Sequence, residues 1–245
     1  MFIFASKNTP FAKLLFNKLV NYYHLDNNNN NDNDNNEAEP RTWTWIQNKK
    51  ELKDTLTLKN REKIQKVFFF HWSFIVPEII FSNYECIVIH TANLPNGRGG
   101  SPIQNQISDN VVHSHVNALR MTGDLDGGDI YCRKPITLQG TLNDIWHVIA
   151  ISSFDLIKSI VDLDIKCQPQ AKPTSESYKR RKDNKIPFEQ DANLRQIYDF
   201  IRMLDGNNYP KSYVELGAFR LEFSRASYCL DTSKILCDVK ISKKD

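Results

Sequence analysis

Apolar and polar positions in the first 165 residues alternate between strand-like and helix-like spacing. Short apolar or alternating runs predict strands at 2–5, 42–46, 67–70, 85–89 and 116–121. Apolar residues three or four apart predict helices at 11–19, 49–58, 74–81 and 142–163. This alternation predicts an α/β fold, a Rossmann-like open and mostly parallel sheet with helices on both faces.

Two local signals refine this pattern. Ser101-Pro102-Ile103-Gln104 combines an N-cap serine, proline at the first helical position and a glutamine suited to a capping box. A helix is therefore expected to begin at Ser101. A hairpin is expected near Asp129 to Arg133.

Composition divides the chain into two predicted parts. Residues 1–165 form the main domain, with an Asn-rich stretch at 26–38 that is too polar to bury surface and is expected to be a disordered insertion. Residues 166–245 are expected to hold a polar linker at 166–189 and a small α+β C-terminal subdomain. In that subdomain the pattern predicts a helix at 194–204 and strands at 213–215, 219–223 and 235–241.

Charge and cysteine usage exclude several classes. The formal net charge of +3 is mild and dispersed, which argues against a nucleic-acid partner. The basic run 178–182 is either a phosphate contact or a solvated loop. No segment reaches membrane length, no signal peptide is evident, and the five scattered cysteines indicate reduced thiols, so a cytoplasmic protein is expected. No histidine has ligand spacing, so no metal is expected.

Candidate chemistry follows the predicted strands. In open α/β sheets, ligands bind at the carboxyl ends of the strands. That rule selects His71, His90 and the loop from Asp124 to Asp129. A lone histidine at a strand end is more often structural than catalytic, so the wider motif decides the interpretation.

The wider motif is specific. His90-Thr91-Ala92-Asn93-Leu94-Pro95 is followed by Arg98-Gly99, by Pro102-Ile103 and later by Leu125-Asp126-Gly127-Gly128-Asp129-Ile130. This order and spacing resemble the catalytic core of the folate-dependent formyltransferases, which include methionyl-tRNA, glycinamide ribonucleotide and amino-sugar N-formyltransferases. The likeness extends from the first strand to about Leu163, with weaker echoes at 199–202 and 219–221.

One subgroup of the family is the most similar. His71-Trp72-Ser73 and Gly97 to Pro102 resemble formyltransferase-like proteins found beside bacterial surface-sugar genes, as do segments 178–182 and 199–205. The resemblance implies N10-formyltetrahydrofolate as co-substrate, no metal, and an amine acceptor on a sugar that is nucleotide-linked, by analogy with that subgroup.

The resemblance also implies roles for individual residues. His90 would act as general base and proton shuttle, and Asp126 would orient His90 or stabilise its protonated form. Folate contacts would come from four positions, Leu125, Gly128, Arg98 and Ser73. Arg98 could equally brace its glycine-rich loop, and Asp124 and Asp129 are expected only to shape their turn.

One position departs from the family's pattern. The family has asparagine two residues before its histidine, where this chain has Val88. Losing one oxyanion donor costs about 3 kcal/mol in other enzymes. Asn93 and His71 are the two candidate replacements. Three hypotheses therefore stand: an amino-sugar N-formyltransferase, a methionyl-tRNA formyltransferase-like enzyme, and a catalytically silent homologue that binds folate or a sugar nucleotide.

Overall fold

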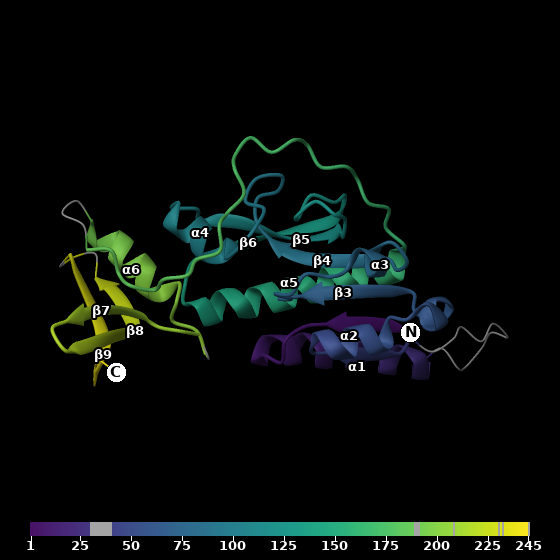
Figure 1. Cartoon of the computed structure of the whole chain (residues 1–245), viewed down its shortest axis with the longest axis horizontal. Coiled ribbons are helices and arrows are strands. Elements are labelled where there is room, and N and C mark those ends of the chain that lie inside the picture. Colours follow the sequence, from purple (N-terminus) through teal and green to yellow (C-terminus); the bar gives the residue numbers. More distant parts are fainter. Residues whose placement is uncertain (30–40, 189–191, 208, 230, 232, 245) are drawn as a thin grey trace.

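The protein folds as a six-stranded sheet with helices and a small three-stranded sheet (Figure 1). The structure is a computed structural model and describes residues 1–29, 41–188, 192–207, 209–229, 231 and 233–244. The strands are β1 (Phe2–Ala5), β2 (Trp43–Ile46), β3 (Lys66–Phe70), β4 (Cys86–Thr91), β5 (His113–Arg120), β6 (Ile130–Thr137), β7 (Ser212–Leu216), β8 (Phe219–Cys229) and β9 (Lys234–Lys243). The helices are α1 (Pro10–Asn29), α2 (Lys49–Thr55), the 3-10 helix η2 (Leu58–Lys63), α3 (Glu78–Phe81), α4 (Pro102–Ser108), α5 (Leu142–Leu163) and α6 (Leu194–Arg202).

The large sheet confirms the predicted α/β class. Its strand order is β2-β1-β3-β4-β5-β6, and the first four strands run parallel. Strands β5 and β6 are antiparallel to their neighbours. The order reverses between β1 and β3, because the chain leaves β1 for β2 on one side and returns to β3 on the other. The carboxyl ends of β1 and β3 therefore form the switch point at which such sheets bind ligands.

The central parallel strands β1, β3 and β4 bury most of both faces, which explains their nearly continuous apolar runs in the sequence, whereas the edge strand β2 is partly exposed. Phe68 and Phe70 of β3 lie in the same core as α1 and α5. Val67 and Phe69 point the other way, into the core that contains residues of α2 and α3. The alternation of side chains along the strand thus separates the two helical layers.

The predicted elements are largely confirmed, with four corrections. The helix predicted at 74–81 spans only Glu78–Phe81. Helix α1 continues through Asn29, so residues 26–29 are helical and only 30–38 of the expected insertion lie outside the described residues. The helix predicted at 49–58 ends at Thr55 and gives way to η2. The hairpin expected at 129–133 is instead the start of strand β6, and the chain turns at 121–129.

Helix α4 starts where predicted but for a different reason. Pro102 occupies the first turn, yet Ser101 has a left-handed φ of 47° and its side chain makes no capping bond. The Ser101 hydroxyl accepts a hydrogen bond from the Arg181 backbone N–H at 3.1 Å, and Gln104 donates to the Met203 carbonyl at 3.3 Å. Both predicted capping residues therefore bind the C-terminal part of the chain.

The C-terminal sheet β7-β8-β9 is attached to the main sheet through α6. Asp199 accepts hydrogen bonds from both Arg195 and Arg202. Arg202 also donates to the backbone carbonyls of Leu138 at 2.6 Å and Gly140 at 2.9 Å. This buried arginine therefore ties α6 to the turn between β6 and α5. The domain boundary at residues 165/166 stays a prediction.

Replacing Arg202 with methionine should loosen this attachment. The substitution leaves Asp199 partly uncompensated and two carbonyls without a donor, and breaking a buried ion pair typically costs about 3 to 5 kcal/mol. The midpoint of thermal unfolding should fall by roughly 10 °C for a protein of this size. Arg195→Met is the matched control, because its guanidinium contacts the same carboxylate from a side chain that is 47% exposed and should cost under about 1 kcal/mol. Equal effects of the two variants would contradict this account.

Candidate functional site

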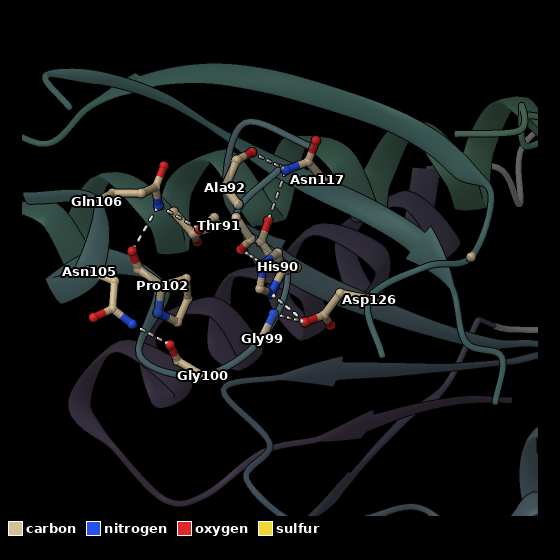
Figure 2. Close-up of polar contacts among 12 residues, drawn as sticks. His90, Thr91, Ala92, Gly99, Gly100, Pro102, Asn105, Gln106, Asn117 and Asp126 are labelled. Atoms are coloured by element: carbon tan, nitrogen blue, oxygen red, sulfur yellow. Dashed lines mark hydrogen bonds and ion pairs between the residues drawn. The ribbon is translucent and has the colours of Figure 1, made fainter. Parts of the chain in front are cut away.

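His90 lies near the end of β4 and is covered by two loops. The loop at 93–100 follows β4, and the turn at 121–129 joins β5 to β6 (Figure 2). The loops meet where the Gly99 N–H donates to the Asp126 Oδ2 at 2.9 Å. His90 itself is only 7% exposed. A polar ring is thus enclosed in a small polar environment at the sheet surface.

Both ring nitrogens of His90 face oxygen atoms. Nδ1 lies 3.5 Å from the Asp126 Oδ2 (Figure 2), and Nε2 lies 3.1 Å from the Gly97 carbonyl oxygen. The ring carries two protons only in its charged form, and in that form both nitrogens have an acceptor. The surroundings therefore suit an imidazole that takes up a proton during a reaction. The predicted pair, His90 and Asp126, is brought together.

Local backbone requirements explain the residue types in these loops. Asp126 has a φ of 49°, a left-handed conformation that aspartate tolerates better than most residues. A Cβ on Gly128 would lie 1.8 Å from the Arg120 carbonyl oxygen. A Cβ on Gly99 would lie 2.3 Å from the Tyr178 carbonyl oxygen. Only glycine fits at positions 99 and 128.

The turn that carries Asp126 begins at the opposite end of the sheet from the one expected. Strand β5 is antiparallel to β4, and Ile87 pairs with Arg120. The Met121 N–H accordingly bonds to the carbonyl of Cys86, the first residue of β4. The rule on carboxyl ends therefore does not apply to this turn. Asp126 reaches His90 because the turn folds back over the sheet.

The segment expected to be a linker is packed over these loops. In Figure 1 it crosses the large sheet from the end of α5 towards α6. Gln170 donates to the Asp126 carbonyl at 2.9 Å and to the Gly128 carbonyl at 2.6 Å. The Tyr178 backbone pairs with the Arg98 carbonyl and the Gly100 N–H. Residues 166–182 therefore hold both loops, which their polar composition did not indicate.

His71 ends β3 in a strained conformation. Its φ is 48°, which is unusual for a residue that is not glycine, and its ring centroid lies 4.4 Å from that of Trp146 on α5. It lines a cavity of about 110 Å³ with Asn8, Thr9 and Asn207, among others. Burial, followed by the charges of Lys7 and Arg180, lowers the pKa of His71 to about 4. The ring is neutral at physiological pH, in a cavity at the switch point.

Acidification should therefore destabilise the fold through His71. Between pH 6.5 and about 4 the unfolded chain binds a proton at this position that the folded chain does not, so the free energy of unfolding falls as the pH falls through that window. The full effect is on the order of 3 kcal/mol. His71→Phe should remove this part of the pH dependence in denaturant titrations. His147→Phe, at an exposed position of α5, should leave it in place, and an unchanged slope in His71→Phe would refute the assignment.

Comparison with known proteins identifies the family. The sequence family described as the methionyl-tRNA formyltransferase C-terminal domain matches residues 181–242. A methionyl-tRNA formyltransferase from Clostridium thermocellum is 32% identical, and its structure superposes with a TM-score of 0.82 over 100% of both chains. The chain belongs to the formyltransferase family. The first curated relatives, methionyl-tRNA formyltransferases such as that of Rickettsia typhi, are 30% identical over 45% of this chain, which spans 38% of their length.

Two more distant structures share the fold. A sugar N-formyltransferase from Shewanella sp FDAARGOS_354 is 17% identical, with a TM-score of 0.65 over 92% of this chain and 97% of that one. HypX from Aquifex aeolicus in complex with tetrahydrofolic acid is 14% identical, with a TM-score of 0.65 over 92% of this chain and 37% of that one.

The two candidate replacements for the family's asparagine lie in different surroundings. Val88 packs with an apolar cluster that includes Leu119. The exposed Asn93 uses its amide on the start of β5, where it donates to the His113 carbonyl at 3.0 Å and its oxygen lies 2.8 Å from His115 Nδ1. Asn93 would have to leave both partners to approach a reacting carbonyl. His71 lines a cavity, and its ring makes no hydrogen bond to the other described residues.

The four residues predicted to contact folate do not all contact one another. Arg98 donates to Gln170 at 2.9 Å and lies beside Gly127, as expected of a residue that braces the loop. Gly128 supports the turn by its small size. Leu125 is 66% exposed and free to contact a ligand, and Ser73 is half-buried at the end of β3. Their roles towards folate stay predictions.

Sequence reasoning missed two buried side-chain amides beside His90. Asn117 of β5 and Gln106 of α4 are 0% and 2% exposed. Both donate to backbone carbonyls at the end of β4. The sequence holds one signal, since an asparagine interrupts the apolar run of a predicted strand at Asn117.

Two further properties concern the described residues only. No group of three or more histidine, cysteine, aspartate or glutamate side chains is arranged to hold a metal ion there. Within the same part of the chain, every helix is too short or too polar to cross a membrane.

Proposed function

We propose that this protein transfers a formyl group from N10-formyltetrahydrofolate to the amine of a small acceptor, an amino sugar that can be nucleotide-linked. Family membership supports formyl transfer. The fold shared with HypX in complex with tetrahydrofolic acid and with a sugar N-formyltransferase supports the folate donor and the sugar acceptor. The single observation that carries the proposal is the contact between the His90 ring and the Asp126 carboxylate.

The reaction requires a base, and we assign this role to His90. The amine nitrogen attacks the formyl carbon, a carbon–nitrogen bond forms, and the carbonyl oxygen takes up the electron pair. His90 accepts the proton that the amine loses. The Asp126 carboxylate stabilises the resulting imidazolium, as in other carboxylate–histidine pairs.

The same ring returns the proton. When the oxyanion re-forms the carbonyl, the bond between the formyl carbon and N10 of the folate breaks, and N10 takes the proton from His90 as it departs. The Gly97 carbonyl must first leave Nε2, because that atom lies 3.1 Å away. Opening of the 93–100 loop is thus part of the proposed cycle.

Stabilisation of the oxyanion needs a donor other than residue 88. Of the two candidates, we assign the auxiliary role to His71, because its ring lines a cavity while the Asn93 amide is engaged elsewhere. A neutral imidazole carries one N–H donor, and a pKa of about 4 keeps His71 neutral at working pH.

The acceptor is assigned to the cavity at the switch point, whose lining does not include His90, so the acceptor amine would have to extend from this cavity to the ring. Its lining combines the amides of Asn8, Asn143 and Asn207 with the hydroxyl of Thr9 and the indole of Trp146. Amide and hydroxyl groups that bind sugar hydroxyls, beside an aromatic ring, suit a small polar acceptor. Asn207 comes from the C-terminal part of the chain, so both parts contribute to the cavity.

Purified protein tests the proposal directly. It is incubated with N10-formyltetrahydrofolate and a panel of nucleotide-linked and free amino sugars, while tetrahydrofolate release and product mass are followed. Release that depends on one amino sugar, with a mass gain of one formyl group, is the expected result. No transfer to any acceptor would support the catalytically silent alternative, in which the protein binds folate or a sugar nucleotide without turnover.

A second candidate acceptor is methionyl-tRNA. It is favoured by the match of residues 181–242 to the C-terminal domain of that enzyme and by the similarity to the Clostridium thermocellum protein. Charged initiator tRNA therefore belongs in the same panel. Transfer to tRNA in preference to every amino sugar would replace the first candidate by the second.

A further inference from the structure

Three successive backbone carbonyls at the end of β4 accept hydrogen bonds from two buried side-chain amides. The Asn117 Nδ2 lies 3.2 Å from the His90 carbonyl and 2.8 Å from the Ala92 carbonyl. The Gln106 Nε2 lies 2.9 Å from the Thr91 carbonyl between them. Figure 2 shows both amides approaching the chain beside the His90 ring. The segment that carries this ring is therefore held from two elements, β5 and α4.

The orientation of the Asn117 amide is fixed by its surroundings. Its nitrogen also lies 3.3 Å from the His115 carbonyl, so three carbonyls face it and a flipped amide would point its oxygen at them. Its own oxygen is buried and has no hydrogen-bond partner among the described residues. A buried acceptor without a partner is unfavourable for stability. Stability alone therefore does not explain the asparagine at position 117.

The sheet register brings Asn117 next to the reacting ring. Asn117 pairs with His90 across β4 and β5, and paired residues of antiparallel strands project to the same face. The next pair on that face is Val88 with Leu119. A carboxamide is thus retained beside His90 although position 88 has none. Its nitrogen faces the backbone of β4, which suits it to orient His90 and not to bind an oxyanion.

We propose that Asn117, together with Gln106, is a positioning residue that sets the backbone of His90 so that its ring meets Asp126. The inference rests on the proposed function, in which His90 moves the proton. Gln106 is itself oriented, because its oxygen accepts a hydrogen bond from the Ser114 hydroxyl at 2.6 Å.

Asn117→Asp is the sharpest test, since it keeps the shape of the side chain and removes the donor. A carboxylate facing carbonyls cannot hold them, so kcat should fall about tenfold while KM for the formyl donor changes by less than about twofold. Gln106→Glu should act in the same direction. The double variant should lose less than the product of the two single losses, because both amides act on one segment.

The pH profile separates positioning from general damage. The carboxyl group introduced by Asn117→Asp regains a donor when protonated, and burial raises its pKa. Activity of the variant relative to the wild type should therefore rise as the pH falls. Asn60→Asp is the matched control, because the Asn60 amide also donates to a backbone carbonyl, that of Thr55, and Asn60 lies in η2, outside the sheet. This control should leave kcat and the profile unchanged.

A spectroscopic measurement does not depend on turnover. In protein labelled with 15N-histidine, the His90 ring signals are identified by their loss in His90→Ala. Asn117→Asp should shift these signals by more than their line width and leave the signals of His24, His71 and His147, which lie outside β4 and β5, in place. If the wild type transfers no formyl group, the proposed function fails, and this shift still tests the positioning role. Unchanged His90 signals and kcat in folded Asn117→Asp would overturn the inference. If Asn117→Asp does not fold, Asn117→Ser is used in its place. Serine keeps one donor, so this variant should give an intermediate effect.

Discussion

Replacing His90 with alanine is expected to lower kcat for formyl transfer by about a thousandfold. General acid–base groups contribute about 10² to 10⁴ to enzyme rates, and His90 is assigned both the uptake and the return of the proton. The ring contacts Asp126 and the Gly97 carbonyl and bears little of the fold's apolar packing. The variant should therefore still fold and bind folate with nearly unchanged affinity, which separates catalysis from binding.

Single-turnover kinetics with saturating donor measure this effect. His113→Ala is the matched control, because His113 is an exposed histidine at the start of β5 and should retain full activity. The decisive negative result would be a folded His90→Ala protein that transfers formyl groups within about threefold of the wild-type rate, since no other assigned group can take the amine's proton.

The fold was accessible from the sequence because its central strands β1, β3 and β4 are largely buried on both faces. Val67 to Phe70 is a continuous apolar run, which is typical of a parallel strand covered on both faces. Its side chains alternate between two helical layers. The long helix α5 was predicted to within a residue or two, whereas α1 continues ten residues beyond its predicted end at 19. These features depend on local periodicity, which a single sequence contains in full.

The surroundings of His90 depend on tertiary contacts, which the sequence pattern does not encode. Gln170 and Tyr178 lie in a stretch whose composition suggested only a linker, yet they hold both loops over the ring. The predicted caps of α4 are used instead on Arg181 and Met203. The sequence pattern predicted a local role for Ser101 and Gln104 and no contact for Gln170 and Tyr178. In the fold, all four bind residues that are distant in the sequence.

The enclosure of His90 has a kinetic consequence. The ring is 7% exposed, and the loop above it is fastened through Gly99 to Asp126 and through Arg98 to Tyr178. In the proposed reaction, a donor as large as a folate would reach the ring only if residues 93–100 moved. The same loop would then exclude water once the donor is bound, which protects the formyl group from hydrolysis.

Asp126→Asn is expected to reduce kcat by about a thousandfold to ten-thousandfold, although it alters a single atom. The Gly99 N–H and His90 Nδ1 both lie against the Asp126 Oδ2, so the amide oxygen of asparagine would take that place and the negative charge beside the ring would be lost. The imidazolium that forms when His90 accepts the amine's proton then has no carboxylate to balance its charge.

The fold should survive this change, because asparagine also tolerates the left-handed φ of position 126. Circular dichroism and thermal unfolding should therefore match the wild type while the rate collapses. Asp124→Asn, an exposed carboxylate on the same turn, is the paired control and should keep its activity. Similar rates for Asp126→Asn and Asp124→Asn would mean that the carboxylate at 126 only shapes the turn. The assignment of His90 as a base stabilised by Asp126 would then have to be withdrawn.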